Sequence, residues 1–288
     1  MLQIRKLSDA FGAEILGLDL SRELDDATYA ALKKAYADYS VLLLRGQKMS
    51  DERHVEFSRH FGELEIHVLR EYVSPEHPEL YRIGNIKDAS GKAIAIADAG
   101  AYWHTDLSYT SRPSRGSIMQ SHIIPFRDGV AMGDTSFCST AAIYDSLPER
   151  LKKAIEGRKA VHRFWDRYIQ SRRNAGQEVT ISDERRATLP DVEHPMVKVH
   201  PETRRKCLFV NEGFTIRVVA MPEAESRALL DELFSYIGRA ETVYRHKWQV
   251  GDVVMCDNWA TQHALNVDYR PDEPRFMQRT TMVGSEVF

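Results

Sequence analysis

The feature that most constrains the fold of this chain is the pair His104 and Asp106, separated by one residue in a segment rich in aromatic side chains. Alternate side chains of a β-strand point to the same face of a sheet, so an extended backbone places these two groups side by side. Residues two apart on a helix point well away from each other. A shared function of the two side chains therefore requires an extended segment, and we expect a strand over residues 101–109.

A third polar residue, His263, lies far downstream and completes the pattern His-x-Asp…His. Two imidazoles and one carboxylate bind ferrous iron on one face of an octahedron and leave three positions open for an oxidant and a co-substrate. The same groups with one open position also make a catalytic zinc site. An ordinary solvated histidine and aspartate need no metal, so the spacing alone leaves all three interpretations open.

Three other pairs of the form His-x-Glu show that the bare pattern is not specific. These pairs are His54/Glu56, His77/Glu79 and His200/Glu202. The first follows acidic residues typical of a helix start, and the other two enclose a proline and are typical of turns. Only the pair at His104 lies in a strand-like segment, which favours it as a ligand pair.

The composition is that of an ordinary globular protein, with 288 residues, 43% hydrophobic, 28% charged and a net charge of −3. A chain of this length can bury a large core, and so weak a charge does not draw it to nucleic acid or to a membrane surface. Three widely spaced cysteines, Cys138, Cys207 and Cys256, disfavour a disulfide framework or a thiolate zinc site. No signal peptide or transmembrane run is evident. We expect one cytoplasmic domain over residues 1–288 without a nucleic-acid or membrane partner.

Hydrophobic periodicity predicts many short strands with a few helices between them. Helices are expected at residues 26–40, 51–61 and 222–237, with further helical segments between residue 135 and about residue 157. Strands are expected at residues 41–44, 81–86, 101–109, 116–124, 196–199, 208–210, 243–248, 253–256 and 276–283. This order favours a mainly β fold with inserted helices, as a sandwich or barrel, over a doubly wound sheet.

Residues 163–194 differ from the rest because a short aromatic run is followed by a polar segment with several arginines. A loop this long inside a compact domain is usually functional or mobile. We expect a lid or access loop here, and a disordered surface excursion is the alternative.

Several blocks of the chain resemble the taurine dioxygenase (TauD/TfdA) family, and they occur in that family's order. The blocks are residues 12–20, 41–47, 57–64, 103–106, 133–135, 248–252, 257–263 and 274–279. The resemblance covers nearly the whole chain. It implies a double-stranded β-helix, or jelly-roll, core and a dioxygenase that uses Fe(II), 2-oxoglutarate and O2.

The resemblance also assigns roles to particular residues. His104, Asp106 and His263 match the family's iron ligands. Arg275 matches the arginine that pairs with the distal carboxylate of 2-oxoglutarate, and Thr135 matches the threonine that assists it. The physics of this assignment is sound, because a guanidinium binds a carboxylate through two parallel charge-assisted hydrogen bonds that lysine cannot reproduce.

The implied reaction converts 2-oxoglutarate to succinate and CO2 while an unactivated C–H bond of a small organic acid is hydroxylated, without a general base or a covalent nucleophile. His67 matches a position that taurine-specific members use at the substrate anion, and Arg70 stands where that branch has an aromatic residue. Arg279 lies four residues after the co-substrate arginine, so on a strand it should reach the same cavity, and the resemblance implies a place near bound anions. Tyr102, Trp103, Tyr109 and Phe164 could form apolar walls. We therefore expect an aryloxyalkanoate, whose hydroxylated product can fragment, with an alkylsulfonate as the alternative.

Two connections depart from the taurine-specific branch, namely the stretch between His263 and Arg275 and residues 127–132, and both look longer. They affect loop shape and hence substrate selectivity. Two rival functions of other classes remain, a hydrolytic zinc enzyme and a jelly-roll binding protein without catalysis. The sequence leaves the oligomeric state open.

Overall fold

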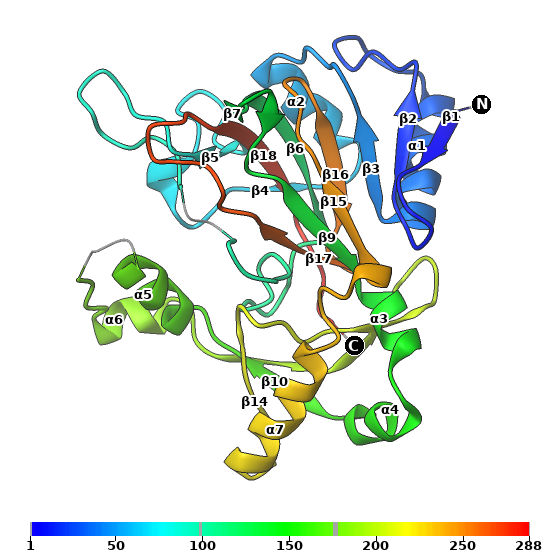
Figure 1. Ribbon diagram of the computed structural model, residues 1–288, viewed down its shortest axis with the longest axis vertical. Helices are drawn as coiled ribbons and strands as arrows, with labels where there is room; N and C mark the ends of the chain where they lie inside the picture. Colours follow the sequence, from blue (N-terminus) through cyan, green and yellow to red (C-terminus); the bar gives the residue numbers. More distant parts are fainter. Residues whose placement is uncertain (1, 98–99, 175–177, 288) are drawn as a thin grey trace.

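The computed structural model describes residues 2–97, 100–174 and 178–287, and its main feature is an eight-stranded sheet (Figure 1). The strand order is β1-β2-β3-β16-β6-β18-β4, and β5 pairs with β18. These strands are β1 (Gln3–Lys6), β2 (Ala13–Leu16), β3 (Val41–Leu44), β4 (Leu64–Glu65), β5 (Tyr81–Gly84), β6 (Gly116–Ile123), β16 (Val253–Asp257) and β18 (Phe276–Met282). All the pairs are antiparallel except β2 with β3.

A second sheet has the order β15-β9-β17 and is antiparallel throughout. Its strands are β9 (Thr135–Ser139), β15 (Val243–His246) and β17 (Thr261–Leu265). Smaller sheets pair β7 (Phe126–Arg127) with β8 (Val130–Ala131), β12 (Val197–Val199) with β13 (Lys206–Leu208), and β10 (Lys159–His162) with both β11 (Val192–Pro195) and β14 (Thr215–Val218).

Helices are inserted between the strands. They are α1 (Asp26–Tyr39), α2 (Asp51–Arg59), α3 (Thr140–Ser146), α4 (Glu149–Ile155), α5 (Trp165–Asn174), α6 (Asp183–Ala187) and α7 (Glu223–Phe234), with 3-10 turns η1 (Arg70–Tyr72) and η2 (Ala240–Thr242). Figure 1 shows α1 and α2 beside the large sheet and α3 to α7 at the opposite end of the molecule. None of the helices in the described ranges is both long and apolar enough to cross a bilayer.

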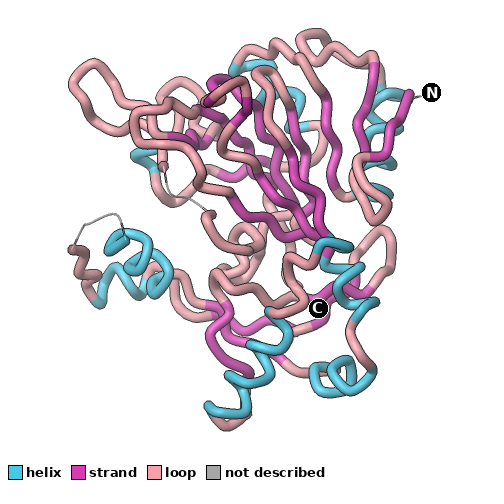
Figure 2. The backbone as a smooth tube through the Cα atoms, viewed as in Figure 1, coloured by secondary structure: helices cyan, strands magenta, loops and turns pink. Residues whose placement is uncertain are grey.

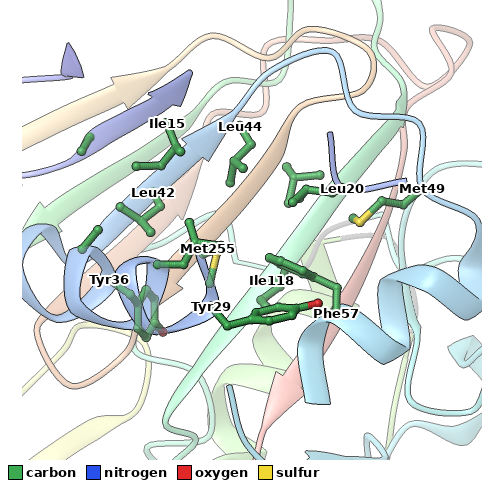
Figure 3. Close-up of a cluster of buried hydrophobic side chains, with 14 of the residues drawn as sticks. Ile15, Leu20, Tyr29, Tyr36, Leu42, Leu44, Met49, Phe57, Ile118 and Met255 are labelled. Atoms are coloured by element: carbon green, nitrogen blue, oxygen red, sulfur yellow. The ribbon is translucent and has the colours of Figure 1, made fainter. Parts of the chain in front are cut away.

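The central strands of the large sheet are buried on both faces, which explains why β3 is a continuous apolar run rather than an alternating one. Leu42 and Leu44 join one hydrophobic cluster, whereas Val41 and Leu43 join another on the opposite face. Figure 3 shows the first cluster, in which aromatic residues of α1 and α2 cover the sheet face that carries Leu42.

Both covering helices begin and end where local chemistry directs them. Asp25 accepts a hydrogen bond from the backbone N–H of Thr28 and caps α1, and Ser50 accepts one from Arg53 and caps α2. Ser40 ends α1 in a left-handed conformation. The predictions for these two helices are thus confirmed to within about two residues.

Three sequence-based expectations are wrong. Residues 101–109 form no strand, because only His104 makes a β-bridge and the chain then turns through Leu107, whose φ is 57°. Residues 163–194 are not one long loop, because they contain α5, α6 and β11 (Figure 2). The predicted helical stretch after residue 135 also begins with a strand, β9. The three cysteines are buried free thiols, as their spacing suggested.

Gly84 gives a test of the packing that places the start of β18. Its φ is 145°, and an added Cβ would lie 1.9 Å from the backbone oxygen of Arg275. We expect Gly84→Ala to destabilise the protein by well over 1 kcal/mol, since the strained backbone and the clash both have to be relieved. Gly129→Ala is the matched control, because Gly129 has a φ of 78° but no atom within 4 Å of an added Cβ. Thermal unfolding followed by circular dichroism should show a clearly larger decrease in Tm for Gly84→Ala, and equal decreases would contradict the packing argument.

Candidate metal and co-substrate site

His104, Asp106 and His263 lie together at one end of a buried cavity, and each offers a ligand atom within 4.8 Å of the other two. His104 Nε2 is 3.7 Å from Asp106 Oδ1, and His263 Nε2 is 3.9 Å from Asp106 Oδ2. The backbone explains this proximity. His104 N–H donates to the carbonyl of His263 at 3.1 Å, and His263 N–H donates back at 3.0 Å, so one antiparallel bridge joins the turn to β17.

The protonation states of these three groups suit a divalent metal. His104 Nδ1 is 2.9 Å from the carbonyl oxygen of Tyr102, and a carbonyl only accepts, so Nδ1 carries the hydrogen and Nε2 offers its lone pair. Burial lowers the pKa of His263 to about 3, which keeps this imidazole neutral. Burial alone would raise the pKa of Asp106, but the charge of Arg279 holds it well below its usual range. A deprotonated donor set is what metal binding requires.

Arg279 of β18 reaches the cavity, as its spacing from Arg275 predicted, but its guanidinium is engaged by the carboxylate of the cluster. Its Nη1 donates to Asp106 Oδ2 at 2.7 Å, and both side chains are buried. The bond leaves Asp106 Oδ1 facing His104. Arg279 therefore fixes the orientation of the carboxylate as well as its charge.

Arg275 lies immediately before β18 and is only 2% exposed. Its Nη2 donates to the carbonyl of Gly133 at 3.2 Å. Within residues 2–97, 100–174 and 178–287, no carboxylate forms a salt bridge with this guanidinium, and its Nε has no hydrogen-bond partner. Gly133 is required at its position, because an added Cβ would lie 2.8 Å from Arg275 Nε. Thr135, the first residue of β9, lines the same cavity.

Part of the cavity lining is aromatic. Tyr109 lies with its ring centroid 4.6 Å from that of Phe164 and 4.7 Å from that of Phe214. Arg167 covers the ring of Tyr102 at 4.2 Å and donates to the carbonyls of residues 212 and 213. Tyr102 and Tyr109 thus line the cavity, as expected for apolar walls.

His67 and Arg70, the two residues expected at a substrate anion, are placed differently. His67 lines the cavity and stacks on Tyr81 with 3.9 Å between ring centroids. Burial lowers the pKa of His67 to about 3, and its Nδ1 accepts from Leu69 N–H, so the neutral ring carries its hydrogen on Nε2. The structure does not place Arg70 in the cavity, because the chain turns into η1 and leaves this side chain exposed.

Helix α5 contributes residues to the cavity that the sequence patterns did not predict. Tyr168, Ser171 and Arg172 line it together with Arg167. These positions recur at the three- and four-residue spacing of one helical face, a signal that lies inside the arginine-rich run assigned as a loop. Residues 163–174 therefore form a wall of the cavity.

The alternative histidine pairs lie outside this cavity. His54 is buried in α2, with its Nε2 3.0 Å from the carbonyl of Ile118. His200 is also buried, and its Nε2 lies 3.0 Å from Asp257 Oδ2. His77 lies in a turn, as predicted.

Comparisons with known proteins agree with this geometry. The family profile described as "Taurine catabolism dioxygenase TauD, TfdA family" matches residues 3–281. The chain is 32% identical over 266 residues to an alpha-ketoglutarate-dependent 2,4-dichlorophenoxyacetate dioxygenase of Cupriavidus pinatubonensis, covering 89% of each chain. It is 34% identical to an alkylsulfatase of Acinetobacter baylyi, covering 98% of this chain and 85% of the relative.

Solved structures extend the likeness to the fold. A putative alpha-ketoglutarate-dependent taurine dioxygenase from Burkholderia xenovorans has a TM-score of 0.81 and 31% identity, with 100% of this chain and 94% of that chain covered. The complex of AAD-2 with Mn(II) and N-oxalylglycine has a TM-score of 0.82 and 28% identity, with coverages of 100% and 99%. The chain therefore belongs to the taurine catabolism dioxygenase TauD, TfdA family and is a non-haem Fe(II)- and 2-oxoglutarate-dependent dioxygenase.

Proposed function

We propose that this dioxygenase hydroxylates a small organic acid, with an aryloxyalkanoate as the preferred class, and that Arg275 binds the co-substrate. The observation that carries the proposal is a buried guanidinium without a carboxylate partner among the described residues, in the same cavity as the His104, Asp106 and His263 cluster. Burying an unpaired charge costs several kcal/mol. A dicarboxylate such as 2-oxoglutarate would compensate this charge when it binds.

His104, Asp106 and His263 are the residues proposed to hold Fe(II), since two imidazoles and one carboxylate with open positions are the preferred donor set of such an iron. Bound iron supplies the activation of O2 that couples oxidation of 2-oxoglutarate to hydroxylation of the substrate. The protein's own contribution is position and charge. Arg279 orients Asp106 through its hydrogen bond, and Arg275 with Thr135 is proposed to hold the distal carboxylate of 2-oxoglutarate.

The charge of the cavity favours acidic ligands. The described lining residues include four arginines and one aspartate. His67 and His263 are neutral, because burial lowers the pKa of each to about 3. The arginines are Arg167, Arg172, Arg275 and Arg279. The lining therefore has more arginines than carboxylates among the described residues, which supports an anionic substrate beside 2-oxoglutarate.

The aromatic wall supports an aryloxyalkanoate over a purely aliphatic acid. The lining of the cavity includes the aromatic residues Tyr102, Tyr109, Phe164, Tyr168 and Phe214. An aromatic ligand gains offset-stacked or edge-to-face contacts with such side chains. His67 Nε2–H is proposed as a donor to the substrate acid. Arg70, being exposed, has no part in this proposal.

The relatives support the same range of substrates. Their names include a 2,4-dichlorophenoxyacetate dioxygenase, a sulfonate dioxygenase of Saccharomyces cerevisiae and a sulfate ester dioxygenase of Pseudomonas putida. An alkylsulfonate or a sulfate ester is therefore the alternative substrate class. A hydrolytic zinc enzyme or a binding module without catalysis would not account for the buried guanidinium of Arg275. We also infer one catalytic domain on a jelly-roll core, supported by the family match over residues 3–281.

Metal binding tests the ligand assignment. We expect His104→Ala to weaken Mn(II) binding by more than about 100-fold, because loss of an outer partner of a ligand alone costs about 10- to 100-fold. Calorimetric titration of Mn(II) under anaerobic conditions measures this. His77→Ala is the control, since His77 belongs to a similar His-x-Glu pair in a turn. Unchanged Mn(II) affinity in His104→Ala would exclude this residue as a ligand.

Co-substrate binding tests Arg275. Arg275→Lys keeps the charge but loses the two parallel hydrogen bonds, so the KM for 2-oxoglutarate should rise about 10- to 100-fold. Succinate release at varied 2-oxoglutarate concentration gives this value. The same substitution at the exposed Arg270 should leave the KM unchanged. Equal effects of the two variants would remove Arg275 from the co-substrate site.

A substrate panel tests the preferred class. We expect substrate-dependent succinate release to be fastest with an aryloxyacetate and slower with both an alkylsulfonate and an alkyl sulfate. Tyr168→Ala should lower kcat/KM for the aryloxyacetate about 10-fold, because an aromatic wall is lost, and should affect the aliphatic acids much less. A clear preference of the unmodified enzyme for an aliphatic acid would overturn the aryloxyalkanoate assignment and keep the reaction class.

A further inference from the structure

Trp248 makes a polar contact with a residue of the proposed co-substrate site. This residue lies between β15 and β16 and is fully buried. Its indole Nε1–H donates to Thr135 Oγ1 at 3.0 Å. Trp248 itself does not line the cavity, whereas Thr135 lines it together with Arg275. This hydrogen bond therefore links a buried residue outside the cavity to the hydroxyl group of a residue in the proposed co-substrate site.

The chemistry of the two groups sets the direction of this hydrogen bond. An indole N–H can only donate, so the oxygen of Thr135 must be the acceptor. The hydroxyl keeps its own hydrogen, and across the described parts of the chain no hydrogen bond is found in which Thr135 Oγ1 donates. The backbone of Thr135 is already paired with His246 on one side and Leu265 on the other. The cavity is thus the side on which this hydroxyl hydrogen can find an acceptor.

The indole is held firmly by its surroundings. His246 packs edge-on against Trp248, with 4.4 Å between ring centroids and an interplanar angle of 86°. Phe137, Val254 and Met277 belong to the same hydrophobic cluster. A buried indole N–H without a partner is strongly disfavoured. Trp248 therefore keeps its bond to Thr135 whether or not a ligand is in the cavity.

We propose that Trp248 is a positioning residue for the co-substrate, because it commits the Thr135 hydroxyl to donate toward the distal carboxylate of 2-oxoglutarate beside Arg275. A carboxylate only accepts hydrogen bonds, so a hydroxyl whose lone pair is already occupied is complementary to it before binding. Without Trp248, the hydroxyl could turn a lone pair to the anion and repel it. This inference rests on the proposed function of Thr135 and Arg275.

Trp248→Phe tests the proposal, since it keeps an aromatic ring and removes the N–H. Calorimetric titration of the Mn(II)-loaded protein with 2-oxoglutarate should show a dissociation constant raised about three- to ten-fold. The affinity for Mn(II) itself should not change. In turnover, the KM for 2-oxoglutarate should rise while kcat at saturation stays the same. Trp259→Phe is the control, because this indole is also buried and does not line the cavity.

A double-mutant cycle separates positioning from packing. In a Thr135→Val background, which lacks the hydroxyl, Trp248→Phe should have no further effect on 2-oxoglutarate binding. In a Thr135→Ser background, which keeps the hydroxyl, the effect of Trp248→Phe should return. An equal loss in all three backgrounds would overturn the proposal in favour of a packing role.

Three other outcomes distinguish this inference from the proposed function. If Thr135→Val weakens 2-oxoglutarate binding and Trp248→Phe does not, the positioning role is wrong and the co-substrate site stands. If Thr135→Val has no effect while Arg275→Lys does, both the role of Thr135 and that of Trp248 are wrong. If neither substitution affects 2-oxoglutarate binding, the proposed co-substrate site itself is wrong.

Discussion

Two backbone hydrogen bonds between His104 and His263 determine the geometry on which the rest of the site depends. They join a turn-rich segment near residue 104 to strand β17, more than 150 residues later in the chain. Because the pair is antiparallel, the two imidazoles lie close together, with 4.3 Å between ring centroids. Asp106 then needs only the turn after His104 to bring its carboxylate to the same point.

Buried charge is the second constraint, and the buried guanidinium groups of Arg279 and Arg275 differ in how their charge is compensated. Arg279 and Asp106 compensate each other through a direct hydrogen bond, so this pair stabilises the folded site by itself. Arg275 has a carbonyl and a tyrosine ring as neighbours and no carboxylate in contact among the described residues. A protein that keeps such a guanidinium buried gives up some stability, and an anionic ligand restores it.

The residues around these groups come from different kinds of element. Thr135 lies in β9, Arg275 immediately precedes β18, and the buried Trp248 lies between β15 and β16. Tyr168 and Arg172 belong instead to α5, and Phe164 immediately precedes this helix, which lies at the edge of the molecule in Figure 1. Under the proposed function, residues of the sheets would hold the co-substrate and α5 would contact the substrate, at a place where sequence can vary at little cost to the core.

The sequence determined much of the fold and the identity of the proposed ligands. The apolar run at β3, the capped helices α1 and α2 and the strands β6, β16 and β18 follow from local patterns, and the ordered blocks of motif point to one family. Strands β9 and β17 escaped prediction, because residues such as Thr135 and His263 are polar and their burial comes from distant partners. The helical face of α5 was also not predicted, because it lies in a polar, arginine-rich run.

What only the tertiary structure decided is which groups face one another. Spacing put His104 and Asp106 on an expected strand, whereas the chain in fact makes one bridge and then turns. Local sequence patterns do not show that Arg279 is bound to Asp106 while Arg275 has no carboxylate partner among the described residues, or that Arg70 is exposed while Arg172 lines the cavity. Local sequence fixes backbone preference and residue chemistry, but the pairing of charges depends on contacts between segments far apart in the chain, and these exist only once the sheets have assembled.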